Sequence, residues 1–412
     1  MVMESLDAFR QRARDWLAGN LPRLPADAQP WNGMRVGTDE ARRAKELQAL
    51  LFEAGFAGLC FPKEYGGQGL APEYQRAFGE EAQSYEMPLL FNTPTFTIIA
   101  PTILDLGTEA QKRRHLPAMI RGEELWVQFM SEPSGGSDLA GAITSAKFDG
   151  DNYLLNGSKI WSSYAAFSDY AICLARTDWD AVKHQGLTMF IVKIHQPGVE
   201  VNQIRQSDGG AEFCQEFFDD VPIPLENVLG KVNDGWTSAQ RLLFHERSAS
   251  GGASPYAVGV SGRRRDTVED LVRLARARER SDDSHVRDLI AEIHVLQTVQ
   301  AQTIERVTKG IASQGLPPTS GAVPRLFGSL NGVRRSDVTF EIAGTESIAW
   351  ERADSPSTVG NDYIFRQAWS LGGGSVEMQR NIISERVLGM PREAAADRGM
   401  PFKEVRRNAP SK

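Results

Sequence analysis

Short stretches of this 412-residue chain carry residues whose types and spacing could do chemistry. One is QFMSEPSGGSD, where Ser131 and Ser137 flank two glycines. Small residues let exposed backbone N–H groups and hydroxyls approach a flat or anionic ligand closely. The same composition is also that of an ordinary turn. Alone, it indicates only a candidate binding loop.

Two further stretches could contact the same kind of ligand. NGSKIWSSYA places Trp161 on a strand among hydroxyl residues, as a core residue or as a cover for a cofactor ring. Near the C-terminus, GGGS ends at Ser375, directly before a helix that is expected to begin near Val376. Free N–H groups at a helix start bind phosphate, although Ser at this position is also a common helix cap.

A candidate general base lies in LLFHERSASGG, at Glu246. A helical Glu beside an Arg is commonly a solvated surface charge. Here the preceding residues are apolar, and the small residues that follow leave room for a ligand. A carboxylate whose pKa is raised by partial burial can remove a proton from carbon. His245 points about 100° away on a helix, and we expect it to be a structural or rim residue.

The periodicity of apolar residues predicts the elements that must position these groups. Helical spacing lasts to about residue 120, interrupted by the loop PKEYGGQG, and it returns after GWTSAQ. Between them, about six short runs of period two, with a hairpin at DGDN, predict a small β-barrel or sandwich. The predicted parts are an N-terminal helical domain (1–125), a β-domain (126–233), a C-terminal helical bundle (234–393) and a polar, frayed tail (394–412).

Composition narrows the class of protein. A formal net charge of −7 opposes binding to nucleic acid and to anionic membranes. The three widely spaced cysteines favour neither a disulfide scaffold nor a cysteine-based metal site, and no metal is predicted. The N-terminus lacks the pattern of a signal peptide, and we expect no stretch long enough to span a bilayer. We therefore expect a cytoplasmic protein.

The order of several motifs makes the chain recognisable. It resembles the acyl-CoA dehydrogenase family through PKEYGGQG, GTEAQKRRHLPAMIRGEE, SEPSGGSDLAG, LNGSKIWSS, FFDDVPIPLENVLG and GGSVEMQRNIISERVLG. The resemblance implies an α+β fold with an N-terminal helical domain, a middle β-barrel domain and a C-terminal four-helix bundle. It also implies an oxidoreductase acting on a CH–CH group, which desaturates an acyl-CoA between Cα and Cβ.

The same resemblance implies the cofactor, FAD, and the residues that bind it. Main-chain groups of Gln128 and Met130 and the hydroxyls of Ser131 and Ser137 would hold the flavin, with Trp161 and Ser163 against its ring. The ADP portion would meet Gly374, Ser375 and Glu377, often from a neighbouring subunit. An oligomer is therefore implied, either a homo-oligomer (dimer or tetramer) or a hetero-oligomer.

The position of the base distinguishes two branches of the family. Many members carry the glutamate at the position of Gly373, whereas isovaleryl- and long-chain-type enzymes carry it on the first bundle helix in a Glu-Arg pair. The chain resembles the second branch. This makes Glu246 the catalytic residue, and Arg247 and Ser137 candidate substrate contacts. Electrons would pass to an electron-transfer flavoprotein.

One family motif is missing, and alternatives stay open. The Arg-x-x-Phe-Gly sequence that meets the FAD pyrophosphate has no counterpart in SGRRRDTVEDLVRLARARERSDD, so that contact is unassigned. The chain could be one subunit of a hetero-oligomer with a shared flavin site, or a flavin oxidase on the same fold. A DNA-binding homologue is disfavoured, because acidic residues are interleaved with the arginines.

Overall fold

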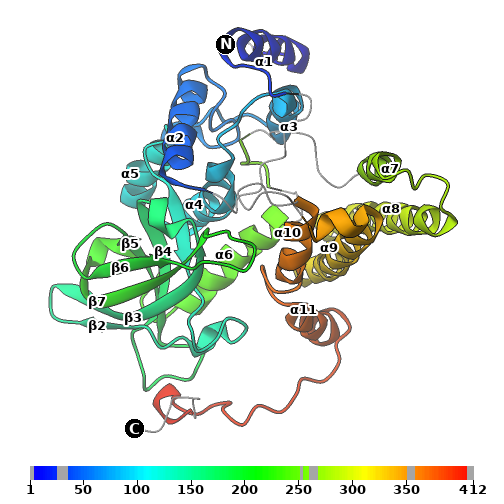
Figure 1. Cartoon of the computed structure of the whole chain (residues 1–412). Coiled ribbons are helices and arrows are strands. Elements are labelled where there is room, and N and C mark those ends of the chain that lie inside the picture. Colours follow the sequence, from blue (N-terminus) through cyan, green and yellow to red (C-terminus); the bar gives the residue numbers. More distant parts are fainter. Residues whose placement is uncertain (1–3, 26–35, 251–253, 259–267, 350–357, 406–412) are drawn as a thin grey trace. The chain divides into compact units, whose positions relative to one another are not determined.

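A computed structural model describes residues 4–25, 36–250, 254–258, 268–349 and 358–405 (Figure 1). The chain divides into two compact units. The first comprises residues 1–205, 210–263 and 395–412, and the second comprises residues 206–209 and 264–394.

The N-terminal part of the first unit is helical, as its apolar spacing predicts. The described α-helices before the sheet are α1 (Leu6–Asn20), α2 (Thr38–Glu53), α3 (Pro72–Glu81), α4 (Ala100–Leu106) and α5 (Glu109–Ile120). Polar side chains cap two of them: Ser5 Oγ accepts from the first turn of α1, and Thr108 forms a capping box in α5. The predicted loop PKEYGGQG is confirmed, with positive φ at Gly66 and Gly69.

The stretch Leu89–Leu106 corrects one expectation. By its 18-residue length and its mean hydropathy of 1.3 it could cross a membrane, whereas we expected no such stretch. However, 67% of it is buried inside the protein. Residues such as Phe91 and Ile99 pack in the core of the N-terminal helices. A core segment of a folded protein meets the same criteria of length and composition.

The middle of the chain forms an eight-stranded sheet (Figure 1). Its strands are β1 (Trp126–Phe129), β2 (Ser145–Phe148), β3 (Asn152–Ser163), β4 (Tyr170–Arg176), β5 (Leu187–Lys193), β6 (Val199–Gln203), β7 (Phe213–Pro224) and β8 (Val228–Leu229). The order is β6-β7-β3-β2-β4-β5-β8, with β1 parallel to β4. The six predicted runs are confirmed, and the short β1 and β8 are additional. In the DGDN hairpin, Asp149 Oδ1 accepts from the N–H groups of Asp151 and Asn152.

Helix α6 (Gly235–Ser250) carries the candidate base and belongs to the first unit. It packs against residues 92–99 and against β5. Ala239 and Leu242 are fully buried on this helix. The sheet and the N-terminal helices therefore fix the helix on which Glu246 lies.

The second unit is helical. It contains α7 (Val268–Ala277), α8 (Ser284–Ala312), α9 (Ala322–Ala343), α10 (Thr358–Phe365) and α11 (Val376–Ile382). The long apolar stripe predicted for α8 is confirmed where Val286, Leu289 and Ile293 are buried, and they pack with Val338 and Ile342 of α9.

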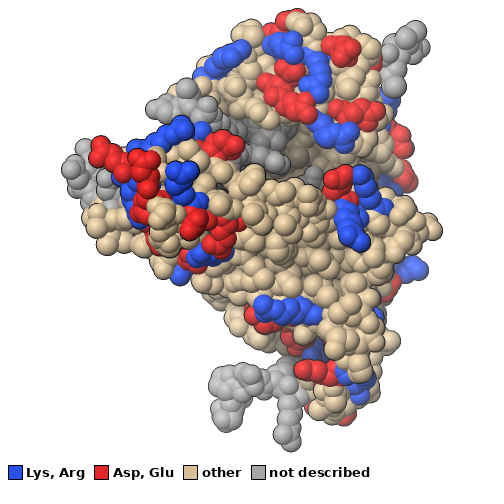
Figure 2. Space-filling model, turned by 90° about the vertical axis from the view of Figure 1, so that its right-hand side faces the viewer, with Lys and Arg blue, Asp and Glu red and all other residues tan. Residues whose placement is uncertain are grey.

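The arginine-rich run falls partly outside the described residues, because residues 261–267 are not described. In its described part, Arg273 pairs with Asp270 of the same helix. Arg280 pairs with Asp283 and donates to backbone carbonyls at the end of α9. On the face shown in Figure 2, blue and red side chains are likewise interspersed. Arg273 and Arg280 thus have local acidic partners, as charged residues on an ordinary helix surface do.

Residues 395–405 return to the first unit. The Phe402 side chain is 1% exposed, and its N–H donates to Ala181 O at 2.8 Å. The expectation of a frayed tail is therefore wrong for these residues, because the side chain of Phe402, in an otherwise polar segment, is buried.

Candidate functional site

The loop Ser131–Asp138 follows β1 and is attached to strand β3. Ser131 O accepts from the N–H of Ile160 at 3.0 Å. A Cβ added at Gly136 would lie 3.4 Å from Ser131 Oγ. Glycine at this position therefore leaves the hydroxyl uncrowded, as a binding loop requires.

A buried ion pair anchors this loop. Lys159 Nζ lies 2.8 Å from Glu132 Oε1 and donates to Met130 O at 3.1 Å, and both side chains are almost completely inaccessible. The Glu132 carboxylate also accepts from the N–H groups of Ile143 and Thr144. Burial opposes ionisation, yet Lys159 and these N–H groups keep the pKa of Glu132 below its ordinary value. The start of the loop is thus tied to one lysine of β3.

Trp161 lies at a β-bulge, where the register between β3 and β7 shifts. Its φ of 67° is uncommon for a side chain of this size. The bulge leaves the ring 55% exposed, edge-on to the ring of Phe213 at 5.9 Å. An indole exposed in this way is available to a planar ligand. Ser163 ends the same strand and is partly buried.

Glu216 lies on strand β7, where it pairs with Lys159 of β3 next to this bulge. It is fully buried on β7, and its Oε2 accepts from Ser162 Oγ at 3.0 Å. Within the described residues, its Oε1 has no hydrogen-bond partner. Burial raises the pKa of Glu216 to about 8, against which the bond from Ser162 and the charge of Lys159 act only partly. The acid is therefore mostly protonated in the folded protein at neutral pH.

The structure brings Glu246 and the strand before the loop together. Gln128 Nε2 donates to Glu246 Oε2 at 3.4 Å, although the two residues lie 118 positions apart. The other amide atom, Gln128 Oε1, is buried and has no hydrogen-bond partner among the described residues. Arg247, next on the helix, is partly buried, and burial lowers the pKa of its guanidinium. A helical carboxylate is thus placed beside the strand that leads into the loop.

His245 points to a different partner. Its Nε2 lies 2.7 Å from Asp105 Oδ2, which also accepts from Arg241 Nε at 2.5 Å. These contacts join α6 to α4. They fit the expected structural role of His245.

The three C-terminal candidates lie in the second unit, at the start of α11. Ser375 is the N-cap and accepts from Met378 N at 3.3 Å, which is the capping alternative. Glu377 is exposed, and Gly374 has a φ of 92°. Gly373 also has positive φ, 67°, so a glutamate there would be strained. Cofactor binding by Gly374, Ser375 and Glu377 stays a prediction.

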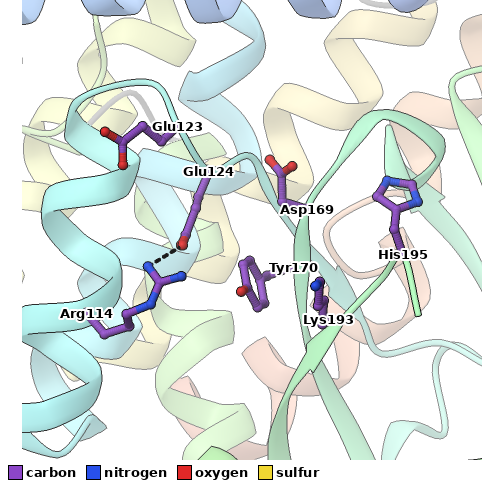
Figure 3. Close-up of a pocket in the computed structure, with 7 residues that line it drawn as sticks. All are labelled: Arg114, Glu123, Glu124, Asp169, Tyr170, Lys193 and His195. Carbon is purple, nitrogen blue, oxygen red and sulfur yellow. Dashed lines mark hydrogen bonds and ion pairs between the residues drawn. The ribbon is translucent and has the colours of Figure 1, made fainter. Parts of the chain in front are cut away.

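A polar pocket of about 470 Å³ lies elsewhere in the first unit (Figure 3). It is lined by Arg114, Glu123, Glu124, Asp169, Tyr170, Lys193 and His195. Arg114 pairs with the buried Glu124 at 2.7 Å. None of the predicted site residues lines this pocket, which mixes positive and negative groups.

Sequence reasoning missed Glu132, Lys159 and Glu216. A signal for the last was present, since Cys214, Glu216 and Phe218 alternate along β7 and are all buried. A charged residue at an inward position of a strand is unusual. Glu132 and Lys159 lie inside recognised motifs, but nothing in their spacing pairs them.

Comparisons with known proteins agree along most of the chain. Residues 3–123, 128–221 and 233–388 match the models of the N-terminal, middle and C-terminal domains of acyl-CoA dehydrogenases. A relative from Mycobacterium tuberculosis, acyl-CoA dehydrogenase IpdE1, is 33% identical over 95% of this chain and 100% of its own length.

Solved structures show the same fold. The Tcur3481-Tcur3483 steroid ACAD has a TM-score of 0.76 and 26% identity, covering 95% of this chain and 100% of its own. The ChsE4-ChsE5 complex from Mycobacterium tuberculosis has a TM-score of 0.71 and 26% identity, with the same coverage. Fold, motifs and relatives agree, and the chain belongs to the acyl-CoA dehydrogenase family of flavoprotein oxidoreductases that act on CH–CH bonds.

Proposed function

We propose that this chain catalyses FAD-dependent α,β-desaturation of an acyl-CoA thioester with Glu246 as the base. The observation that carries the proposal is the contact of Glu246 with Gln128 at 3.4 Å. This contact joins a helical carboxylate to Gln128, one of the predicted flavin residues, and it supports the proposal because the sequence indicated the two stretches separately.

The reaction requires one proton and one hydride to leave the substrate. The Glu246 carboxylate takes the proton from Cα, and the C–H bond at Cβ breaks as the double bond forms. A bound flavin supplies the hydride acceptor. The Gln128 amide orients the Glu246 carboxylate, and the main chain at Gln128 and Met130 would hold the flavin. Ser137 and Arg247 are proposed to contact the thioester ligand.

The residues present fit FAD. The loop contains small residues around two hydroxyls, and the exposed indole of Trp161 offers a flat apolar face near Ser163. Start-of-helix residues Gly374 and Ser375 suit an anionic portion of the cofactor. In our proposal, those residues and Glu377 act on the cofactor of a neighbouring subunit.

We also propose a bulky acyl group and an assembly with an unlike subunit. One similar structure is a steroid ACAD named for a pair of chains, Tcur3481-Tcur3483, and a second is a two-chain complex, ChsE4-ChsE5. Part of the small-residue stretch after Glu246 lies outside the described residues. Electron-transfer flavoprotein is the proposed acceptor, in the cytoplasm.

Anaerobic titration tests the proposal. The protein, alone and co-expressed with a candidate partner subunit, is supplied with FAD and then with a panel of linear, branched and steroid acyl-CoA thioesters. We expect visible flavin absorption that a bulky thioester bleaches without oxygen. A protein that takes up no FAD under either condition contradicts the proposal, whereas peroxide formed at the rate of turnover identifies an oxidase.

A further inference from the structure

A segment near the C-terminus, residues 395–405, folds onto the first unit beyond the region that the family model matches. That match ends at residue 388. We call residues 395–405 the C-terminal strap. It is attached through backbone bonds from Phe402 N to Ala181 O at 2.8 Å and from Lys403 N to Trp179 O at 2.9 Å.

Phe402 covers a buried arginine. The Arg176 guanidinium carbon lies 3.4 Å from the centroid of the Phe402 ring, and both side chains are essentially inaccessible. Arg176 donates to four backbone carbonyls, at 2.7 to 3.1 Å, of Ala140, Ala142, Lys183 and Gln185. A buried guanidinium requires such partners, and an aromatic face stabilises it further. Phe402 thus closes over the group that joins residues 140–142 to residues 183–185.

A second contact joins the strap to the binding loop through Lys183. Lys183 Nζ lies 2.9 Å from Asp138 Oδ2 and 2.9 Å from Asp397 Oδ2. Asp138 is the last residue of the loop that begins at Ser131, and Asp397 belongs to the strap. The lysine side chain is only 18% exposed, so its charge is partly shielded from water. One cation therefore bridges the strap and the loop.

We propose that the C-terminal strap is a positioning element for the Ser131–Asp138 loop, acting through Lys183 and Arg176. Glu132 and Lys159 fix the upstream end of this loop to β3, and the strap fixes its downstream end. A loop ordered before its ligand arrives loses less conformational freedom on binding, and so it binds more tightly. The ligand in question is the flavin cofactor, so this part of the inference rests on the proposed function.

The test compares three variants of the full chain with the wild type. Asp397→Asn removes one carboxylate from Lys183, Phe402→Leu removes the aromatic cover of Arg176, and Glu404→Gln makes the same charge change at an exposed strap residue. Amide hydrogen exchange is measured without cofactor across the chain, including residues 131–142 and the rest of the sheet, and the dissociation constant for FAD is measured by flavin fluorescence.

In Asp397→Asn and Phe402→Leu we expect faster exchange in residues 131–142, in the strap and in residues 179–185 that the strap contacts, with the rest of the sheet unchanged. The dissociation constant should rise about threefold for the partly exposed ion pair and about tenfold for the buried cover. Glu404→Gln should behave as the wild type. A purely structural role of the strap would instead raise exchange throughout the sheet.

The outcomes separate the two proposals. Unchanged exchange of the loop in Asp397→Asn, or a rise spread over the whole sheet, overturns the positioning role, and this measurement remains decisive if Phe402→Leu does not fold. If the loop responds as expected but the wild type binds no FAD, the positioning role stands and the proposed function fails.

Discussion

At the scale of single residues, replacing Glu246 with Gln separates shape from basicity. The amide keeps the size of the side chain and can still meet Gln128, but it cannot accept the α proton. We expect the fold and the bound flavin to survive, while flavin reduction by substrate slows by about 10² to 10⁴. Stopped-flow absorbance under anaerobic conditions measures this rate. The matched control is Glu226→Gln, an exposed glutamate before α6. Equal rates in both variants would place the base elsewhere.

Glu216 predicts a pH dependence of stability. Its pKa is about 8 in the folded protein against an ordinary value of 4.5, so folding favours the protonated acid. The stabilisation is complete below pH 4.5 and is lost as the pH rises to about 8. Glu216→Gln resembles the protonated form at every pH. Relative to this variant, the wild type should lose about 3 kcal/mol of unfolding free energy between about pH 5.5 and 8.

Urea unfolding at several pH values measures that difference. Glu200→Gln, at an exposed glutamate on the neighbouring strand β6, is the control. Because this variant keeps Glu216, its stability should stay parallel to that of the wild type across the same pH range. A wild type and a Glu216→Gln variant whose stabilities stay parallel across this range would show that the buried acid titrates normally.

At the scale of elements, the loop and strand β3 depend on the Lys159–Glu132 pair. Both partners are buried, so Lys159→Met leaves an uncompensated carboxylate, which typically costs about 3 to 5 kcal/mol. We expect a loss of that size in urea unfolding and weaker FAD binding. Lys147→Met, on the exposed side of β2, should change stability by about 0.5 kcal/mol or less. If the two variants prove equally stable, the buried pair does not anchor the loop.

At the scale of the whole molecule, the assembly decides whether the site is complete. Gly374, Ser375 and Glu377 are proposed to act on the cofactor of a neighbouring subunit, so the isolated chain should contain less than one FAD per polypeptide. Co-expression with an unlike family subunit should raise this ratio, and native mass spectrometry should show both chains. A homo-oligomer that already binds one FAD per chain would contradict the unlike-subunit proposal.

The sequence alone was enough for the order of elements and for the family. Helical and twofold periodicities reflect which side chains must be buried, so they predicted the helices, six of the strands and the DGDN hairpin. Motif order identified the loop at Ser131, the strand of Trp161 and the helix of Glu246. These are local properties, since each depends on residues a few positions apart.

Only the tertiary structure decided which distant residues meet. Gln128 lies beside Glu246, Lys159 neutralises Glu132, and Phe402 covers Arg176 although the two lie far apart in the chain. No periodicity encodes such pairs, because they arise from the packing of α6, the Ser131–Asp138 loop and the C-terminal strap against different strands of one sheet. The polar composition of the tail indicated fraying for the same reason. Phe402 is buried by residues far away in the sequence, and the composition of the tail alone gives no sign of them.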